Sequence, residues 1–159
     1  MYERLIELLQ VQSVLYNELL ESARQKKGYI INNNIDSISR VTSHENALIG
    51  KLQRAESERQ ALASNIAKHM RISADGLTLA ILISRVNDPS VREQLDCLRV
   101  SLRSSMDKLK VLNEQNKALI NQSLEYIDYT VNLLRSSVSG PVYARAEEIH
   151  GQVFFEARG

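Results

Sequence analysis

Residues 88–135 read DPSVREQLDCLRVSLRSSMDKLKVLNEQNKALINQSLEYIDYTVNLLR, and leucine, isoleucine and valine recur in them mostly at steps of three, four or seven. This spacing puts the apolar side chains on one face of an α-helix. Asp88 is a typical helix cap and Pro89 a typical first helical residue, while the Ser-rich segment ending in Gly140-Pro141 stops the pattern. The sequence therefore predicts one long helix to about Arg135, whose apolar stripe must be covered by other segments.

Two more helices and one short apolar segment precede it. Residues 2–31 and 35–70 both carry apolar side chains at steps of three and four, and three asparagines at 32–34 separate them. Asparagine tolerates left-handed backbone and caps helix starts, so we expect a turn there. After a loop at 72–76, the segment 78–86 is short and apolar enough to plug one end of a bundle. We expect the two earlier helices to pack antiparallel along the long one.

These elements predict an all-α protein, namely an elongated antiparallel helical bundle or coiled-coil hairpin of three long helices plus a short one. Six glycines, two prolines and 5% aromatic residues are too few for a β-sandwich or barrel. We expect a helical bundle domain over 1–136 and a flexible C-terminal partner-binding tail over 137–159. Gly151 weakens a helix in that tail, so the segment is marginal alone and suited to ordering against a partner.

Composition excludes several classes of function. A formal charge of +1 provides no broad positive field, which disfavours nucleic acid as a partner. No stretch reaches the ~20 apolar residues of a membrane span and no secretion signal is evident, so we expect no membrane insertion and a cytoplasmic location.

The single cysteine, Cys97, lies near Leu95 and Leu98 in the helical pattern and is predicted to be a small buried side chain in a reducing compartment.

The motifs of catalysis and metal binding are not found. The chain has no GxxxxGK[ST] phosphate loop, no GxGxxG and no GxSxG elbow. Glu147 and His150 form one Glu-x-x-His pair, but a di-iron bundle needs two. His44 and His69 do not have HExxH spacing. We predict a protein that is not an enzyme and that uses no cofactor or metal.

Four polar residues fall on faces expected to be buried. Glu45 and Arg59 lie on the seam of the second helix, where either their stems lie along the seam with the charged heads in water or paired, or they mark a contact surface. Asn113 and Asn116 lie on the seam side of the long helix, where either they fix helix register or they hydrogen-bond a guest helix. The sequence leaves both pairs of alternatives open.

The last turns of the long helix and the tail are the expected partner-binding region. The first helix is too short to cover the whole stripe of the long one, so the stripe has no evident partner there. The tail holds both phenylalanines of the chain, and its apolar residues step at three and four. The predicted partner-binding residues are Tyr126, Ile127, Leu134, Tyr143, Ile149, Val153, Phe154 and Phe155.

Four stretches carry a resemblance to a known family. They are LIELLQVQSVLYNELLESARQKKGYIINNNIDSISRVTSHENALIGKL; AESERQALASNIAKHM, in which Glu56 and Arg59 match an E-x-x-R; LNEQNKALINQSLEYI, with its N-x-x-N; and a tail with Tyr143, Gly151 and Phe155-Glu156. In their order and spacing they resemble the FlgN family of flagellar export chaperones. One departure is that Ala144 follows Tyr143, whereas the family's tail tyrosine is typically followed closely by glycine.

The resemblance implies a function. A FlgN-like protein would be a cytosolic type III export chaperone that binds the C-terminal helical segment of flagellar hook-associated proteins, the hook-filament junction proteins. It would prevent their premature assembly and deliver them to the flagellar export gate. Tyr143 would then contact the client or the gate, or else it folds back over the bundle end. The alternative function is a structural or scaffolding coiled-coil protein that self-associates.

Overall fold

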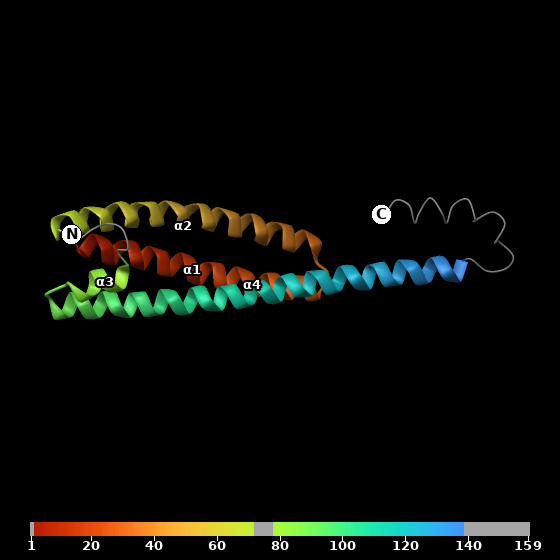
Figure 1. The fold of residues 1–159 in the computed structure, drawn as a ribbon. Coiled ribbons are helices and arrows are strands. Elements are labelled where there is room, and N and C mark those ends of the chain that lie inside the picture. Colours follow the sequence, from red (N-terminus) through yellow and green to blue (C-terminus); the bar gives the residue numbers. More distant parts are fainter. Residues whose placement is uncertain (1, 72–77, 139–159) are drawn as a thin grey trace. The chain divides into compact units, whose positions relative to one another are not determined.

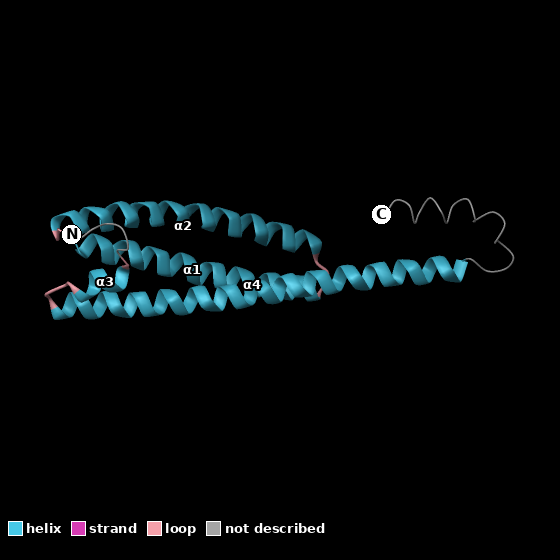
Figure 2. Ribbon diagram, in the orientation of Figure 1, coloured by secondary structure: helices cyan, strands magenta, loops and turns pink. Residues whose placement is uncertain are grey.

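The computed structural model describes residues 2–71 and 78–138. Figure 1 labels its four helices, which are α1 (Tyr2–Ile31), α2 (Ile35–His69), α3 (Leu79–Ser84) and α4 (Pro89–Val138). No strand occurs among the described residues, as Figure 2 shows. The prediction of an all-α protein with three long helices and a short one is confirmed.

Local signals set the turn after α1 and the starts of α2 and α4 where the sequence predicts them, whereas α4 ends at Val138 rather than at about Arg135. Asn33 takes a left-handed backbone with φ of 52°, and the side chain of Asn34 accepts a hydrogen bond from the Ser37 amide at 3.1 Å. At the start of α4 the Asp88 carboxylate accepts from the Ser90 amide at 2.9 Å. The predicted loop at 72–76 lies outside the described residues.

The chain divides into two compact units, Met1–Lys117 and Ala118–Gly159, and α4 contributes to both. Beyond the last turn of α4, the predicted tail lies outside the described residues.

The core of the first unit is built at the end that holds α3. Leu82, Ile83 and Val86 are at most 6% exposed and pack with residues of the three long helices. The whole buried cluster is Leu5, Leu9, Ile66, Leu82, Ile83, Val86, Leu95 and Leu102. The short apolar segment therefore plugs one end of the bundle, as the sequence predicts.

Helices α1 and α2 form an antiparallel hairpin. Arg4, near the start of α1, pairs with Glu58 in the second half of α2 at 3.1 Å. Lys26, near the end of α1, pairs with Glu45 in the first half of α2 at 2.5 Å. The residue numbers run in opposite directions, as the asparagine turn requires.

Helices α1 and α4 run parallel, which corrects part of the expectation that both earlier helices would be antiparallel to the long one. Ser105 donates to Asn17 at 3.3 Å, and Lys27 donates to Gln115 at 3.0 Å. Both contacts join residues 88 positions apart, so the numbers rise together along the two helices. The chain reverses once after α1 and again before α4, which returns it to its first direction.

Cys97 is exposed, contrary to the prediction that it is buried. Leu95, two residues earlier, is 0% exposed. Successive residues of an α-helix are turned by about 100°, so two steps carry Cys97 to nearly the opposite face. Closeness in sequence to a buried leucine was the wrong criterion for this residue.

Candidate partner-binding surfaces

The apolar stripe of α4 changes from buried to exposed along the helix. In the first unit its members include Leu95 at 0%, Leu102 at 7% and Asn116 at 2% exposed. Between residues 118 and 138 the row continues, and four of its members are 39% to 61% exposed, whereas Val131 on the same row is half-buried. These exposed members are Ile120, Leu124, Ile127 and Leu134. An apolar helix face of this kind is typical of a surface that binds another helix.

A second apolar row lies on another side of the same segment. Tyr126 is 69% exposed, and Tyr129 and Leu133 follow it at steps of three and four with exposures of 62% and 49%. Of the predicted site residues, Ile127 and Leu134 therefore share one face, and Tyr126 lies about 100° away from Ile127. The other five lie outside the described residues: Tyr143, Ile149, Val153, Phe154 and Phe155.

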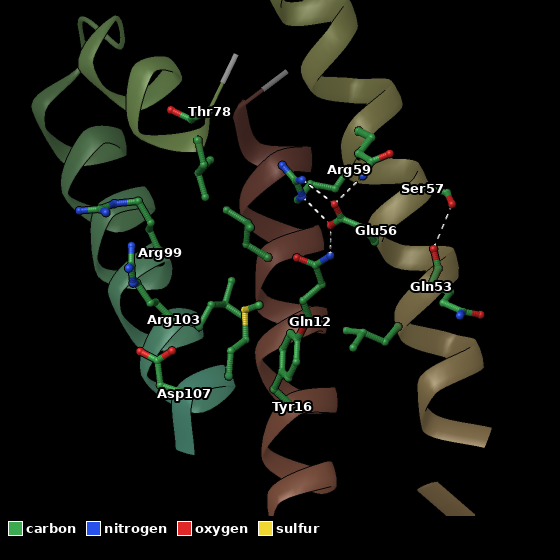
Figure 3. Close-up of a pocket in the computed structure, with 16 residues that line it drawn as sticks. Gln12, Tyr16, Gln53, Glu56, Ser57, Arg59, Thr78, Arg99, Arg103 and Asp107 are labelled. Carbon is green, nitrogen blue, oxygen red and sulfur yellow. Dashed lines mark hydrogen bonds and ion pairs between the residues drawn. The ribbon is translucent and has the colours of Figure 1, made fainter. Parts of the chain in front are cut away.

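A groove of about 960 Å³ lies in the first unit and is lined by all four helices or their caps. Figure 3 shows α1 at its centre with Gln12 and Tyr16, α2 on one side with Glu56, and α4 on the other with Arg103. Five apolar side chains also line it: Leu9, Leu52, Leu79, Leu102 and Met106. Charged side chains of α2 and α4 line it as well, namely Glu56, Arg59, Arg99, Arg103 and Asp107.

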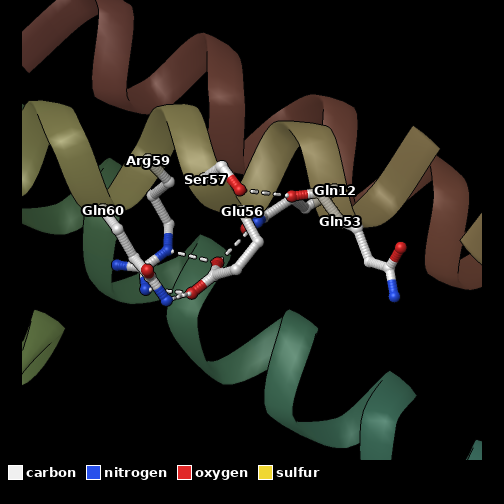
Figure 4. Close-up of polar contacts among 6 residues, drawn as sticks. All are labelled: Gln12, Gln53, Glu56, Ser57, Arg59 and Gln60. Atoms are coloured by element: carbon white, nitrogen blue, oxygen red, sulfur yellow. Dashed lines mark hydrogen bonds and ion pairs between the residues drawn. The ribbon is translucent and has the colours of Figure 1, made fainter. Parts of the chain in front are cut away.

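A polar network forms the α2 wall of the groove (Figure 4). Arg59 donates to the Glu56 carboxylate through Nε at 2.7 Å and Nη2 at 2.6 Å. Gln12 of α1 donates to the same carboxylate at 2.9 Å, and Gln60 donates at 2.8 Å. The Gln12 hydrogen bond ties α1 to α2, the other three lie within α2, and the pairing of Glu56 with Arg59 balances the two charges on this wall.

The network shifts the pKa of its acid. Hydrogen bonding from Arg59 first, and from Gln12 and Gln60 as well, lowers the pKa of Glu56 to about 2 against the opposing effect of burial. Burial, helped by the charge of Glu56, raises the pKa of Tyr16 above its ordinary value. Glu56 is thus a permanently charged acceptor at neutral pH, and its role is structural rather than that of a proton donor.

The side chains that pair with Glu45 and Arg59 decide between the two interpretations that the sequence leaves open for these residues. Glu45 is 8% exposed and accepts from Lys26, so it is paired in the hairpin seam. Arg59 is paired with Glu56, yet it also lines the groove. Sequence reasoning missed Gln12, which is 5% exposed in the structure. One signal in the sequence was available, because Gln12 is a polar residue on the apolar face of α1.

Asn116 is part of the α1–α4 contact. Its side-chain amide donates to the Ala23 carbonyl at 2.9 Å, which holds the two parallel helices in register. Its Oδ1 is buried without a hydrogen-bond partner among the described residues, a state that costs about 1–3 kcal/mol. Asn113 is exposed. The register alternative therefore applies to Asn116, and Asn113 takes no part in the seam.

Within residues 2–71 and 78–138, no three histidine, cysteine or acidic side chains gather closely enough to hold a metal ion. Across the same ranges, no helix combines the length and hydropathy needed to cross a bilayer.

Comparison with known proteins bears on nearly the whole chain. A family model described as FlgN protein matches residues 1–149. No curated protein and no solved structure matches the chain.

Proposed function

The chain belongs to the FlgN family of flagellar export chaperones, and on that premise we propose that it binds the C-terminal helical segment of hook-associated proteins in the cytoplasm and delivers them to the export gate. The family is one of chaperones rather than enzymes. A free amphipathic helix self-associates through its apolar face, and a protein that covers this face lowers the concentration of free client without any chemical step.

The observation that carries the proposal is the exposed stripe of α4 between residues 118 and 138. Ile127 and Leu134 are more than half exposed although they continue the row that is buried earlier in α4. A client helix laid along this row would bury apolar surface at about 25 cal/mol per Å². Tyr126 adds an aromatic side chain with a polar tip, a residue type that is common at binding hot spots.

A matched pair of substitutions on one helix tests the site. Ile127 and Val100 both lie on α4 and are 53% and 55% exposed. Ile127→Glu should weaken binding of a C-terminal hook-associated protein fragment at least tenfold, about 1.4 kcal/mol. Val100→Glu should change it less than twofold. Isothermal titration calorimetry gives both values, and equal losses in the two variants would contradict the proposal.

The tail is proposed to complete the client site or to contact the gate. Removal of residues 140–159 should leave the circular dichroism of the helices nearly unchanged and weaken client binding at least tenfold. Tyr143→Ala should leave the melting temperature unchanged and reduce client binding or export. A fall of several degrees in the melting temperature would instead show that Tyr143 covers the bundle, because losing a buried aromatic costs about 3–5 kcal/mol.

One observation favours the second candidate, a self-associating coiled coil. The steps of four, three and seven from Ile120 through Leu124 and Ile127 to Leu134 also suit pairing with a second copy. Sedimentation equilibrium separates the two functions. A dimer at micromolar concentration that Ile127→Glu converts to a monomer, without any effect on client affinity, would support self-association in place of the chaperone site.

A further inference from the structure

The inward-facing row of α4 changes in character after Leu102. Up to that point its members are all apolar, and they are Val91, Leu95, Leu98 and Leu102. The row continues at steps of three and four through Ser105, Leu109, Leu112 and Asn116. Two of these four later positions are therefore polar, and both polar side chains are buried, Ser105 at 8% and Asn116 at 2% exposed.

The earlier part of the row has the stronger apolar anchor. Leu95 and Leu102 belong to the core cluster at the end that holds α3, here called the α3-end cluster, together with residues of α1, α2 and α3. The second cluster of the first unit consists of Leu15, Leu19 and Leu48. Among the described residues of α4, Leu109 alone packs against this second cluster, and it is only half-buried. Apolar contact thus holds α4 mainly at the α3 end.

Two hydrogen bonds connect the later part of the row to α1. Ser105 donates to Asn17 at 3.3 Å, and the side-chain amide of Asn116 donates to the Ala23 carbonyl at 2.9 Å. Water can replace each of these bonds, so separating these groups from α1 costs little. Apolar side chains at the same two positions would instead lose their burial on separation.

Helix α2 covers little of this part of α4. Figure 3 shows α1 between α2 and α4, and the groove opens beside α1 at this level. Its walls include Leu52 of α2 and Arg103, Met106 and Asp107 of α4. Met106 is 48% exposed in this groove. The later part of the row is therefore held chiefly by α1.

We propose that α4 pivots on the α3-end cluster, so that residues 103–117 separate from α1 and return while the α3 end of the first unit stays closed. No glycine or proline lies between residues 90 and 117, so the helix moves as a rod rather than bending. The polar side chains of Ser105 and Asn116 make this opening easier than an apolar row would. The movement does not depend on the chaperone function.

Labelling of buried thiols in the folded protein tests the pivot. In a Cys97→Ala chain, a single thiol is introduced by Ser105→Cys or by Ala67→Cys. Both positions are buried, at 8% and 1% exposed, but Ala67 lies on α2 next to Ile66 of the α3-end cluster. Ser105→Cys should react with a thiol reagent about a hundredfold faster than Ala67→Cys, because opening of part of a fold is more frequent than its unfolding. Its rate should change little with urea below the unfolding transition, because the opening exposes little surface.

A matched pair of asparagine substitutions tests the cause. Asn116→Leu makes the row apolar at a buried position and should slow the labelling of Ser105→Cys about tenfold. Asn113→Leu makes the same change at an exposed position of α4 and should alter the rate less than twofold. Neither substitution should speed the labelling of Ala67→Cys.

Three results would overturn the proposal. Equal labelling rates of Ser105→Cys and Ala67→Cys would show that both thiols are reached by unfolding of the whole unit. A Ser105→Cys rate that rises steeply with urea would show the same. An unchanged or faster Ser105→Cys rate in the Asn116→Leu chain would show that the polar row does not cause the opening. The comparison of the two thiols uses no change at Asn116, so it decides the question even if Asn116→Leu does not fold.

Discussion

Replacing Glu56 by glutamine tests the polar network that joins α1 to α2. The carboxylate accepts two hydrogen bonds from Arg59 and one each from Gln12 and Gln60. Glutamine keeps the shape of the side chain but removes the negative charge opposite Arg59 and replaces one acceptor oxygen by a donor. We therefore expect Glu56→Gln to lower the free energy of unfolding at neutral pH.

The magnitude follows from the pKa. A fall in the pKa of Glu56 from 4.5 to about 2 corresponds to at most ~3.4 kcal/mol of stability at neutral pH. The Glu56 side chain is 39% exposed and that of Arg59 is 21% exposed. Solvent screens a pair of this exposure, so the expected loss on substitution is about 1 kcal/mol.

The same pKa predicts how the loss depends on pH. The pKa of Glu56 is lower in the folded protein than in the unfolded chain, so its contribution is complete above about pH 5 and is lost as the pH falls toward 2. The Glu56→Gln chain has no carboxyl to titrate at this position. The stability difference between parent and variant should therefore be largest at pH 7 and fall to less than half at pH 3.

Urea unfolding followed by far-ultraviolet circular dichroism at pH 7, 5 and 3 measures this difference. Glu58→Gln is the matched control, because Glu58 is on the same helix and its pair with Arg4 is 58% exposed on both sides. The control should cost at most a few tenths of a kcal/mol. A pH-independent loss in Glu56→Gln, or a loss equal to that of the control, would refute the reasoning.

Three further predictions concern stability and reactivity. Lys26→Leu should lower the free energy of unfolding in urea by about 2 kcal/mol, because it leaves Glu45 buried without a cation. Adding Glu45→Leu should recover most of this loss, and failure to recover it would contradict the pairing. Asp88→Ala should lower the free energy of unfolding by about 1 kcal/mol, because it removes the side chain that caps α4. Asp88→Asn keeps a capping side chain and should lower it much less, and equal losses in the two variants would argue against the cap. The exposed thiol of Cys97 should react with a thiol reagent without denaturant, and Cys97→Ala should change stability by less than ~0.5 kcal/mol; a slow reaction or a larger loss would show that it is buried.

Helix ends were predictable because their causes lie within a few residues. The cap at Asp88 acts on the amide of Ser90, and the left-handed Asn33 lies inside the turn it makes. The end of α2 at His69 differs from the expected Met70 by one residue, since Met70 is the cap itself. Part of the candidate partner-binding surface could also be predicted from the sequence, because the apolar row through Ile127 and Leu134 is a periodic pattern.

The groove could not be predicted in this way. It brings Gln12 of α1, Glu56 of α2 and Arg103 of α4 to one place, and no spacing within a single segment relates them. The resemblance pointed to Glu56 and Arg59 as a motif, but their bond to α1 through Gln12 required the hairpin to be in its actual register.

Sequence alone determined that this protein is made of helices, where each one begins and ends to within about three residues, and which face of each is apolar, because helical periodicity and capping depend on neighbours in the chain. The tertiary structure decided which of those faces are covered. It set α1 parallel to α4, joined Lys26 to Glu45, left Cys97 in solvent and kept Ile127 exposed on a row that is buried at Leu95. The physical reason is that an apolar stripe needs only some partner to be stabilised, and the identity of that partner depends on contacts between residues far apart in the sequence.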